Sequence, residues 1–248
     1  MMLTHASNTI AIASGKGGVG KTWFSITLAH ALVRQGRRIL LFDADFGLAN
    51  IDIQLGLPPH HDLADVLAGT VTFAQAVQHH APAGFDLLAG RSGSGILAQL
   101  ETGRLDHALG LLAEHANRYD HVLLDLGAGL EAGVRRTAAW AETLLVMATD
   151  EPTSLTDAYA TLKLHAADKP GGDTRLVVNQ AASAAAAERT GATLGRACTT
   201  FLGRAPTFLG GIRRDYRVPE AIRHQALSLT RHPTSPAAQD VERIAEAL

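Results

Sequence analysis

Residues 15–22 read Gly-Lys-Gly-Gly-Val-Gly-Lys-Thr, a glycine-rich segment with two lysines. Gly15, Gly20, Lys21 and Thr22 satisfy the phosphate-binding pattern G-x-x-x-x-G-K-[ST] in full. The glycines permit backbone angles that other residues avoid, so that successive N–H groups can turn inward around phosphate oxygens. An apolar strand precedes the loop and a helical stretch, 22–35, follows it. That context favours a nucleotide site over a chance glycine-rich turn.

Each residue type in the loop suggests a role. Lys21 is expected to reach the β- and γ-phosphates, and the Thr22 hydroxyl is expected to ligate Mg²⁺. Trp23 follows directly, and an aromatic side chain on a first helical turn is more often packing than a platform for a base. The residues of this stretch that we expect beside the nucleotide are Gly15, Lys16, Gly17, Gly18, Val19, Gly20, Lys21, Thr22 and Trp23.

Composition narrows the class of protein. A chain of 248 residues suffices for one large α/β domain over 1–248, and no apolar run reaches the roughly 18 residues of a membrane span. The start lacks the features of a secretory leader. Cys198 is the only cysteine, which excludes internal disulfides and cysteine metal clusters and fits a cytoplasmic protein. A net charge of −2 argues against a large nucleic-acid-binding face.

Strand and helix patterns alternate along the chain. This alternation predicts an α/β fold with a doubly wound, mostly parallel sheet, helices on both faces and a P-loop at its centre. The expected strands are 9–14, 38–42, 85–89, 121–126, 143–148, 175–179 and 206–209. The expected helices include 22–35, 105–116, 155–166, one within the alanine-rich stretch from 181, and a last one capped by Ser235.

Three aspartates stand where strands end. Asp43 and Asp45 follow the second strand, and Asp125 closes an apolar run in the Walker B arrangement. Gly127 then lets the backbone approach a γ-phosphate. One isolated aspartate would be a solvated strand end or a helix cap. Three of them after a phosphate loop favour a site that holds Mg²⁺ and places the attacking water.

With these motifs the chain resembles the MinD/ParA ATPases, which carry a deviant Walker A loop with the extra lysine Lys16. The matching segments span most of the chain: 15–22, 43–52, 55–58, 62–67, 119–130, 151–159, 178–179 and 211–215. Within the family, Gly-Leu-Ala-Asn-Ile-Asp at 47–52 and the segment 151–159 resemble the FlhG/FleN flagellar number regulators, also called YlxH.

The resemblance implies roles for single residues. Lys16 would cross a dimer interface to the partner's nucleotide, Asp45 would orient the hydrolytic water, and Asp43 would shape the same switch. Asn179 would pair with adenine, although a turn asparagine is the alternative. The implied metal set is Thr22, Asp43 and Asp125, and the implied base pocket adds Arg213 and Asp215.

The implied function is an ATP-dependent dimerising switch with slow hydrolysis, using ATP/ADP and Mg²⁺, that regulates flagellar placement or number. Its implied partners are a second copy and an FlhF-like GTPase, a flagellar regulator or a C-ring component, which would recruit it to the pole or membrane. The alternative is a positioning ATPase for a chromosome, pilus, division site or organelle. An electron-transfer protein would need cysteines at the dimer interface, and Cys198 is the only cysteine. A nucleotide-binding interaction module that does not hydrolyse ATP is a further alternative, and the presence of Asp45 and Asp125 argues against it.

Some features depart from the family pattern. Residues 1–8 lack an Asp-Gln-Ala-x-x-Leu-Arg activator segment, Leu126 follows Walker B, and Asp150 replaces a common proline. The last helix has a narrow apolar stripe, and its polar residues, which include Asp240, are mainly acidic. We therefore expect no autonomous membrane binding.

Two further sets of side chains have more than one interpretation. The pairs His60-His61 and His79-His80 are expected in solvated loops rather than at a metal, because no ligand cluster has zinc spacing. The basic stretch containing Arg213, Arg214, Arg217 and Arg223 is expected to be a solvated face, and it is also the best candidate for a local anion or nucleic-acid contact.

Overall fold

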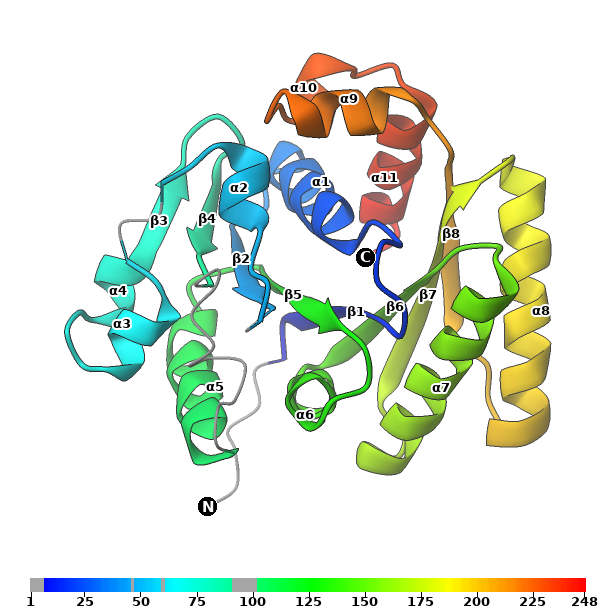
Figure 1. Cartoon of the computed structure of the whole chain (residues 1–248), viewed down its shortest axis with the longest axis horizontal. Helices are drawn as coiled ribbons and strands as arrows, with labels where there is room; N and C mark the ends of the chain where they lie inside the picture. Colours follow the sequence, from blue (N-terminus) through cyan, green and yellow to red (C-terminus); the bar gives the residue numbers. More distant parts are fainter. Residues whose placement is uncertain (1–6, 46, 59–60, 91–101) are drawn as a thin grey trace.

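The computed structural model describes residues 7–45, 47–58, 61–90 and 102–248, whose strands form one eight-stranded sheet (Figure 1). Its order is β3-β4-β2-β5-β1-β6-β7-β8, and every neighbouring pair is parallel except β3 with β4. The strands are β1 (Thr9–Ser14), β2 (Ile39–Ala44), β3 (Val77–His80), β4 (Phe85–Leu88), β5 (His121–Ala128), β6 (Thr143–Ala148), β7 (Asp173–Ala181) and β8 (Thr207–Arg213). The helices are α1 (Lys21–Arg34), α2 (Ile51–Leu55), α3 (Leu63–Leu67), α4 (Phe73–Ala76), α5 (Thr102–Ala116), α6 (Ala132–Trp140), α7 (Pro152–Asp168), α8 (Ala184–Leu202), α9 (Arg217–Arg223), α10 (Ser228–Arg231) and α11 (Pro236–Glu246).

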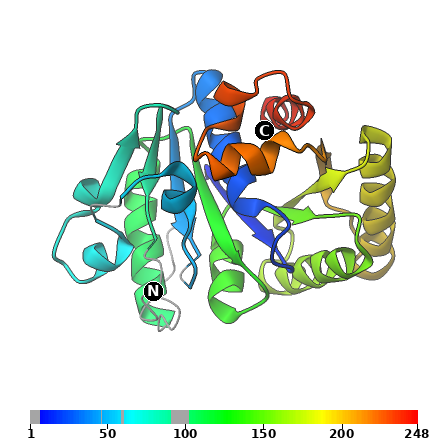
Figure 2. The same cartoon turned by 45° about the horizontal axis from the view of Figure 1, so that its top comes forward.

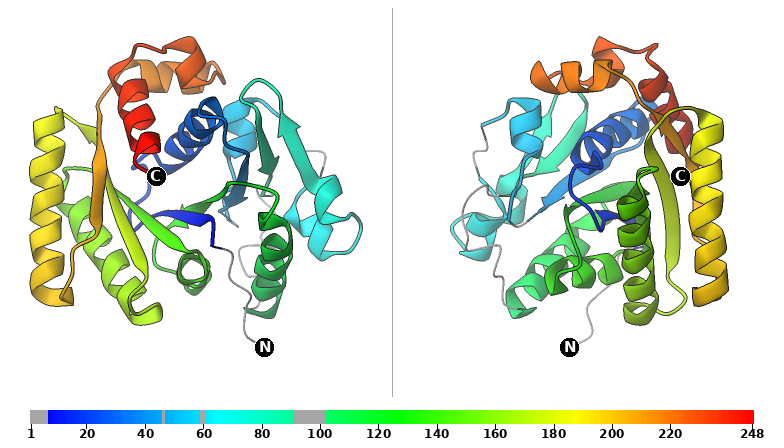
Figure 3. Two further views of the ribbon diagram at one scale, coloured as in Figure 1. Left: turned by 180° about the vertical axis from the view of Figure 1, so that it is seen from behind. Right: turned by 45° about the vertical axis from the view of Figure 1, so that its right-hand side comes forward.

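Helices cover both faces of the sheet, and each face has its own apolar core. Successive side chains of β1 alternate between the two, with Ile10 and Ile12 in one and Ala11 and Ala13 in the other. The core that contains Ile10 and Ile12 packs under α1, α2 and α9–α11. The core that contains Ala11 and Ala13 packs under α3–α8. Figures 2 and 3 show α1 beside the orange-to-red segment α9–α11. The predicted doubly wound, mostly parallel fold is confirmed.

All seven expected strands are present, and β3 was missed. Its four residues, Val-Gln-His-His, carry no apolar alternation, and the strand pairs antiparallel at the sheet edge. The expectation of solvated loops is therefore wrong for His79 and His80. His79 is exposed on β3 and contacts the Asp86 carboxylate at 2.8 Å, whereas His80 is buried. His61 is exposed, and His60 lies outside the described residues.

The last helix begins as expected, because the Ser235 hydroxyl accepts a hydrogen bond from the Ala238 N–H. Its apolar stripe packs onto the domain, with Val241 and Ile244 buried. Asp240, expected among the polar residues that face solvent, lies on the buried side instead and is only 2% exposed. No helix in the described part of the chain is long and apolar enough to span a membrane.

Candidate functional site: a phosphate loop beside a base-sized pocket

The loop between β1 and α1 has the backbone that its glycines suggested. Gly18 and Gly20 have φ values of 77° and 92°, in the left-handed region. The φ of Gly17 lies outside this region. Gly15 is required for a different reason. A Cβ built there would lie 2.5 Å from the Asp157 carbonyl oxygen, so only glycine lets the loop pack against α7.

Lys21 begins α1 and is buried inside the loop. Its Nζ donates to the Ser14 hydroxyl at 2.9 Å. Burial lowers the pKa of this ammonium group, while the Asp125 and Asp45 carboxylates act in the opposite direction. The amine is thus held at one place inside the loop and faces two carboxylates.

Asp125 lies on β5 and is 2% exposed. Its carboxylate accepts hydrogen bonds from the Ser25 hydroxyl, at 2.8 Å, and from Thr22. Burial raises the pKa of Asp125 to about 6, although both hydroxyl bonds favour the charged form. Two of the three residues predicted to hold a metal, Thr22 and Asp125, are therefore already in contact.

Asp43 pairs in register with Asp125 on the adjacent strand β2. Its carboxylate accepts from the backbone N–H groups of Asp45, Asn50 and Ile51, at 3.2, 2.9 and 3.0 Å. Burial, with the Asp125 charge beside it, raises the pKa of Asp43 to about 7. These three bonds hold the segment that follows β2, which favours the predicted switch role of Asp43 over the predicted metal role.

Asp45 stands at the start of that segment. Its Oδ1 accepts from the N–H groups of Gly47 and Leu48, at 3.2 and 3.0 Å, in a tight turn. The Asp45 carboxylate also lies against Gly127, where an added Cβ would come within 3.2 Å of Oδ1. The structure thus brings Asp45, Gly127 and the Walker B strand together at the carboxyl edge of the sheet, as the sequence suggested.

The Lys16 side chain is bonded to residues outside the phosphate loop. Its Nζ forms an ion pair with Glu151 and donates to the Thr153 hydroxyl at 3.1 Å. Both partners lie at the start of α7, and no role was predicted for either of them.

A pocket of about 510 Å³ adjoins the phosphate loop and has a largely apolar lining. Trp23 forms part of its wall and is 5% exposed, while its indole N–H donates to the Ser228 hydroxyl at 2.8 Å. Trp23 is thus both a packing residue and a pocket residue. The lining residues are Gly18, Gly20, Trp23, Asn179, Gln180, Ile212, Arg213, Arg214, Asp215, Tyr216, Val218, Pro219 and Ile222.

The three residues predicted to contact a base all line this pocket. Asn179 donates to the Val19 carbonyl at 2.7 Å and accepts from the Gln180 N–H at 2.8 Å, which ties β7 to the phosphate loop. The Arg213 side chain donates to the Asp240 carboxylate. The Asp215 carboxylate accepts from the backbone N–H of Arg217. Sequence reasoning missed the wall formed by α9. The apolar Val218, Pro219 and Ile222 after the Asp215 loop were the available signal.

The residues present fit a magnesium nucleotide. Magnesium in such sites takes one or two protein oxygens, substrate phosphates and water, so the Thr22–Asp125 pair is a sufficient donor set. The positive φ angles of the loop and the buried Lys21 fit the triphosphate. The pocket beside Gly20 fits the base. Elsewhere, no group of three His, Cys, Asp or Glu in the described ranges has the arrangement of a metal site.

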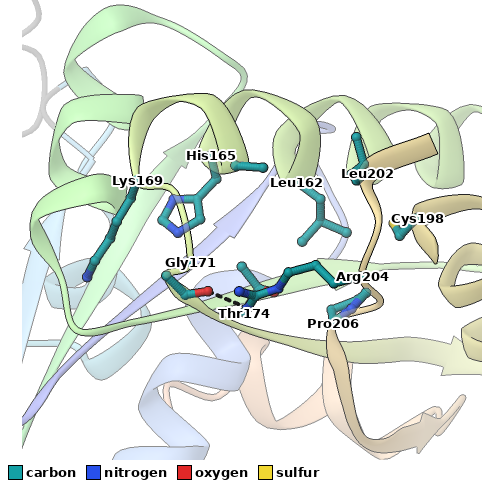
Figure 4. A pocket seen from close by; sticks show the side chains of 11 residues that line it. Leu162, His165, Lys169, Gly171, Thr174, Cys198, Leu202, Arg204 and Pro206 are labelled. Carbon is teal, nitrogen blue, oxygen red and sulfur yellow. Dashed lines mark hydrogen bonds between the residues drawn. The ribbon is translucent and has the colours of Figure 1, made fainter. Parts of the chain in front are cut away.

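A second, smaller cavity of about 30 Å³ lies between α7, α8 and the sheet (Figure 4). His165 lines it, is 4% exposed, and finds no hydrogen-bond partner for either ring nitrogen within the described chain. Burial, aided by the Lys169 charge, lowers the pKa of His165 to about 4. The cavity can hold a water molecule but not a nucleotide.

Comparison with known proteins agrees with this geometry. Residues 10–229 match the CobQ/CobB/MinD/ParA nucleotide binding domain. The chain belongs to this family. Its relatives include the antiactivator FleN of Pseudomonas aeruginosa, 34% identical over 98% of this chain and 86% of that protein. The flagellum site-determining protein YlxH of Helicobacter pylori is 29% identical over 96% and 81%.

The fold comparison points to the same family. The cell division ATPase MinD of Pyrococcus furiosus superposes with a TM-score of 0.80, at 25% identity over 97% of this chain and 98% of that one. The resemblance to MinD/ParA proteins, and within them to FleN and YlxH, is confirmed.

Proposed function

We propose that this MinD/ParA-type protein is a Mg²⁺-dependent ATPase that works as a dimerising switch. ATP-bound copies pair across their phosphate loops, engage a partner protein, and separate after slow hydrolysis. The observation that carries the proposal is the cluster in which Lys21, the Thr22–Asp125 pair and Asp45 converge beside the base-sized pocket.

Each side chain has a distinct part in this proposal. Lys21 would compensate phosphate charge, and Thr22 with Asp125 would hold Mg²⁺, which supplies electrostatic stabilisation of the phosphoryl oxygens when bound. Asp45 would orient the attacking water, and its turn with Gly47 and Leu48 would fix the carboxylate. Lys16 would reach the nucleotide of the second copy.

The names of the relatives support a flagellar role. FleN is an antiactivator and YlxH a flagellum site-determining protein. We therefore propose control of flagellar number or placement through an FlhF-like GTPase, a flagellar regulator or a C-ring component. The alternative is a positioning ATPase for another cargo, because septum site-determining MinD proteins are also similar to this chain.

The test uses the purified chain with ATP or ADP and Mg²⁺. We expect the mass measured by light scattering to double with ATP alone, and phosphate to be released slowly. A monomer at saturating ATP that releases no phosphate would reject the switch. Deleting the gene should change the number or position of flagella. If flagella are unchanged and division or chromosome segregation fails, the alternative holds.

A further inference from the structure

A carboxylate buried in the last helix contacts the wall of the base-sized pocket from behind. Asp240 is 2% exposed although it lies among apolar residues of α11, where an unpaired carboxylate would be costly. It is not part of the pocket lining. Its partners therefore indicate what its burial achieves.

Arg213, the last residue of β8, provides most of these partners. Its backbone N–H and its Nε donate to Asp240 Oδ2 at 2.9 and 2.8 Å, and its Nη2 donates to Oδ1 at 2.9 Å. The same Nη2 donates to the Pro236 carbonyl at 3.2 Å. One carboxylate thus holds both the main chain and the side chain of a pocket-lining residue.

The same loop has a second attachment to α11. The Asp215 carboxylate accepts from the Ala237 N–H in the first turn of the helix, at 3.5 Å, and from the Arg217 N–H at 3.0 Å. Figure 3 shows α11, in red, directly beside β8. The segment 213–216, which forms one side of the pocket, is therefore built against the last helix.

We propose that Asp240 is a positioning residue for nucleotide recognition, which fixes Arg213 and its loop so that the pocket accepts the base of ATP. This inference rests on the proposed function and extends it, because it makes α11 part of the nucleotide site. Asp240 acts on the base and ribose side alone, since Lys21 and the phosphate loop have their own supports in Ser14 and Asp125.

The test compares ATP with inorganic tripolyphosphate, which has no base, by titration calorimetry with Mg²⁺. Asp240→Asn should lower the affinity for ATP by at least about tenfold, because one partner of a buried, hydrogen-bonded charge pair loses its charge. The affinity for tripolyphosphate should be unchanged. In the background of Arg213→Gln, Asp240→Asn should cost little more, because the two residues act as one unit.

Two control variants separate positioning from loosening of the helix. Arg243→Ala removes the other, exposed partner of Asp240, and Glu242→Ala removes the ion pair of α11 with Arg34. Both should bind ATP like the wild type. Thermal unfolding checks that every variant is folded.

Three outcomes would overturn the proposal: wild-type ATP affinity in Asp240→Asn, an equal loss for tripolyphosphate, or an equal loss in Glu242→Ala. If Asp240→Asn does not fold, Arg213→Gln alone must show the selective loss of ATP, and equal losses of both ligands overturn the proposal. A wild-type chain that binds no ATP would instead reject the proposed function.

Discussion

Lys16 and Glu151 form an ion pair within one copy of the chain. Glu151 is the N-cap residue of α7, and Thr153, two residues later, accepts a second hydrogen bond from the same ammonium group. The hydrogen bond and charge of Lys16 lower the pKa of the Glu151 carboxyl. Lys16, which we propose contacts the nucleotide of the other copy, is thus bonded within its own chain. Contact with the second copy's nucleotide requires that the Lys16–Glu151 ion pair breaks.

Weakening this contact should favour dimers. In Glu151→Gln the lysine loses its charged partner, so less ATP should be needed for half-maximal dimerisation, by about two- to fivefold, as suits an exposed ion pair. Sedimentation velocity across an ATP titration measures this. Glu188→Gln, an exposed position on α8, is the matched control. An unchanged or higher ATP requirement would show that Glu151 does not compete for Lys16.

The two lysines of the loop should fail in different ways. Lys21→Ala removes a buried ammonium group that we propose faces the phosphates, so nucleotide binding should fall by about two orders of magnitude or more. Lys16→Ala should bind ATP as a monomer and neither dimerise nor hydrolyse it. Calorimetry followed by size exclusion with ATP distinguishes the two, and a normal Lys16→Ala dimer would reject the exchange of lysines between copies.

Loss of Asp45 should separate binding from turnover. Asp45→Ala removes the carboxylate beside Gly127 but leaves Lys21 and the Thr22–Asp125 pair in place. We expect ATP-bound dimers to accumulate while phosphate release falls at least about 100-fold. Hydrolysis at the wild-type rate would remove Asp45 from the mechanism and make Asp43 the next candidate.

Local patterns in the sequence predicted some parts of the site, whereas contacts between distant segments were not predictable. The phosphate loop, Asp45 and Asp125 were predictable because glycines and carboxylates at strand ends form a local pattern. Strand β3 was not, because its pairing with β4 comes from the sheet rather than from its own residues. The same holds for Glu151 and Asp240. Their partners are 135 and 27 residues away in sequence, and only the fold brings them together.

His165 should make the native state sensitive to acid. The pKa of His165 is about 4 in the folded chain and 6.5 when the side chain is exposed to water. As pH falls, the unfolded chain therefore becomes protonated at this residue before the folded chain does. Stability from this group is complete above pH 6.5 and is lost towards pH 4, by about 1.4 kcal/mol per pH unit at most. His165→Leu should therefore lose less free energy of unfolding than the wild type between these values.

Urea unfolding at several pH values measures this difference. Other groups, such as His30 and Asp43, also titrate there, but they are common to both proteins, so the difference isolates residue 165. His107→Leu, at an exposed position on α5, should leave the acid dependence unchanged. Parallel curves for His165→Leu and wild type would contradict the assignment.

Helix α11 lacks the surface that binds lipid. A helix that binds anionic membranes needs a broad exposed apolar face beside basic residues. In α11 the large apolar side chains Val241 and Ile244 are buried in the domain, and the exposed positions include Glu246 and a single arginine, Arg243. Each basic residue near an anionic surface contributes only about 1 kcal/mol, so Arg243 alone is insufficient.

We therefore expect the 248-residue chain, with ATP and Mg²⁺, to stay in the supernatant when anionic phospholipid vesicles are sedimented. The Asp45→Ala variant, which we expect to accumulate as a dimer, should behave in the same way, because doubling a surface without affinity adds no avidity. A version with a basic amphipathic helix appended after Leu248 is the positive control. ATP-dependent co-sedimentation of the unmodified chain would show that another surface of the dimer binds lipid.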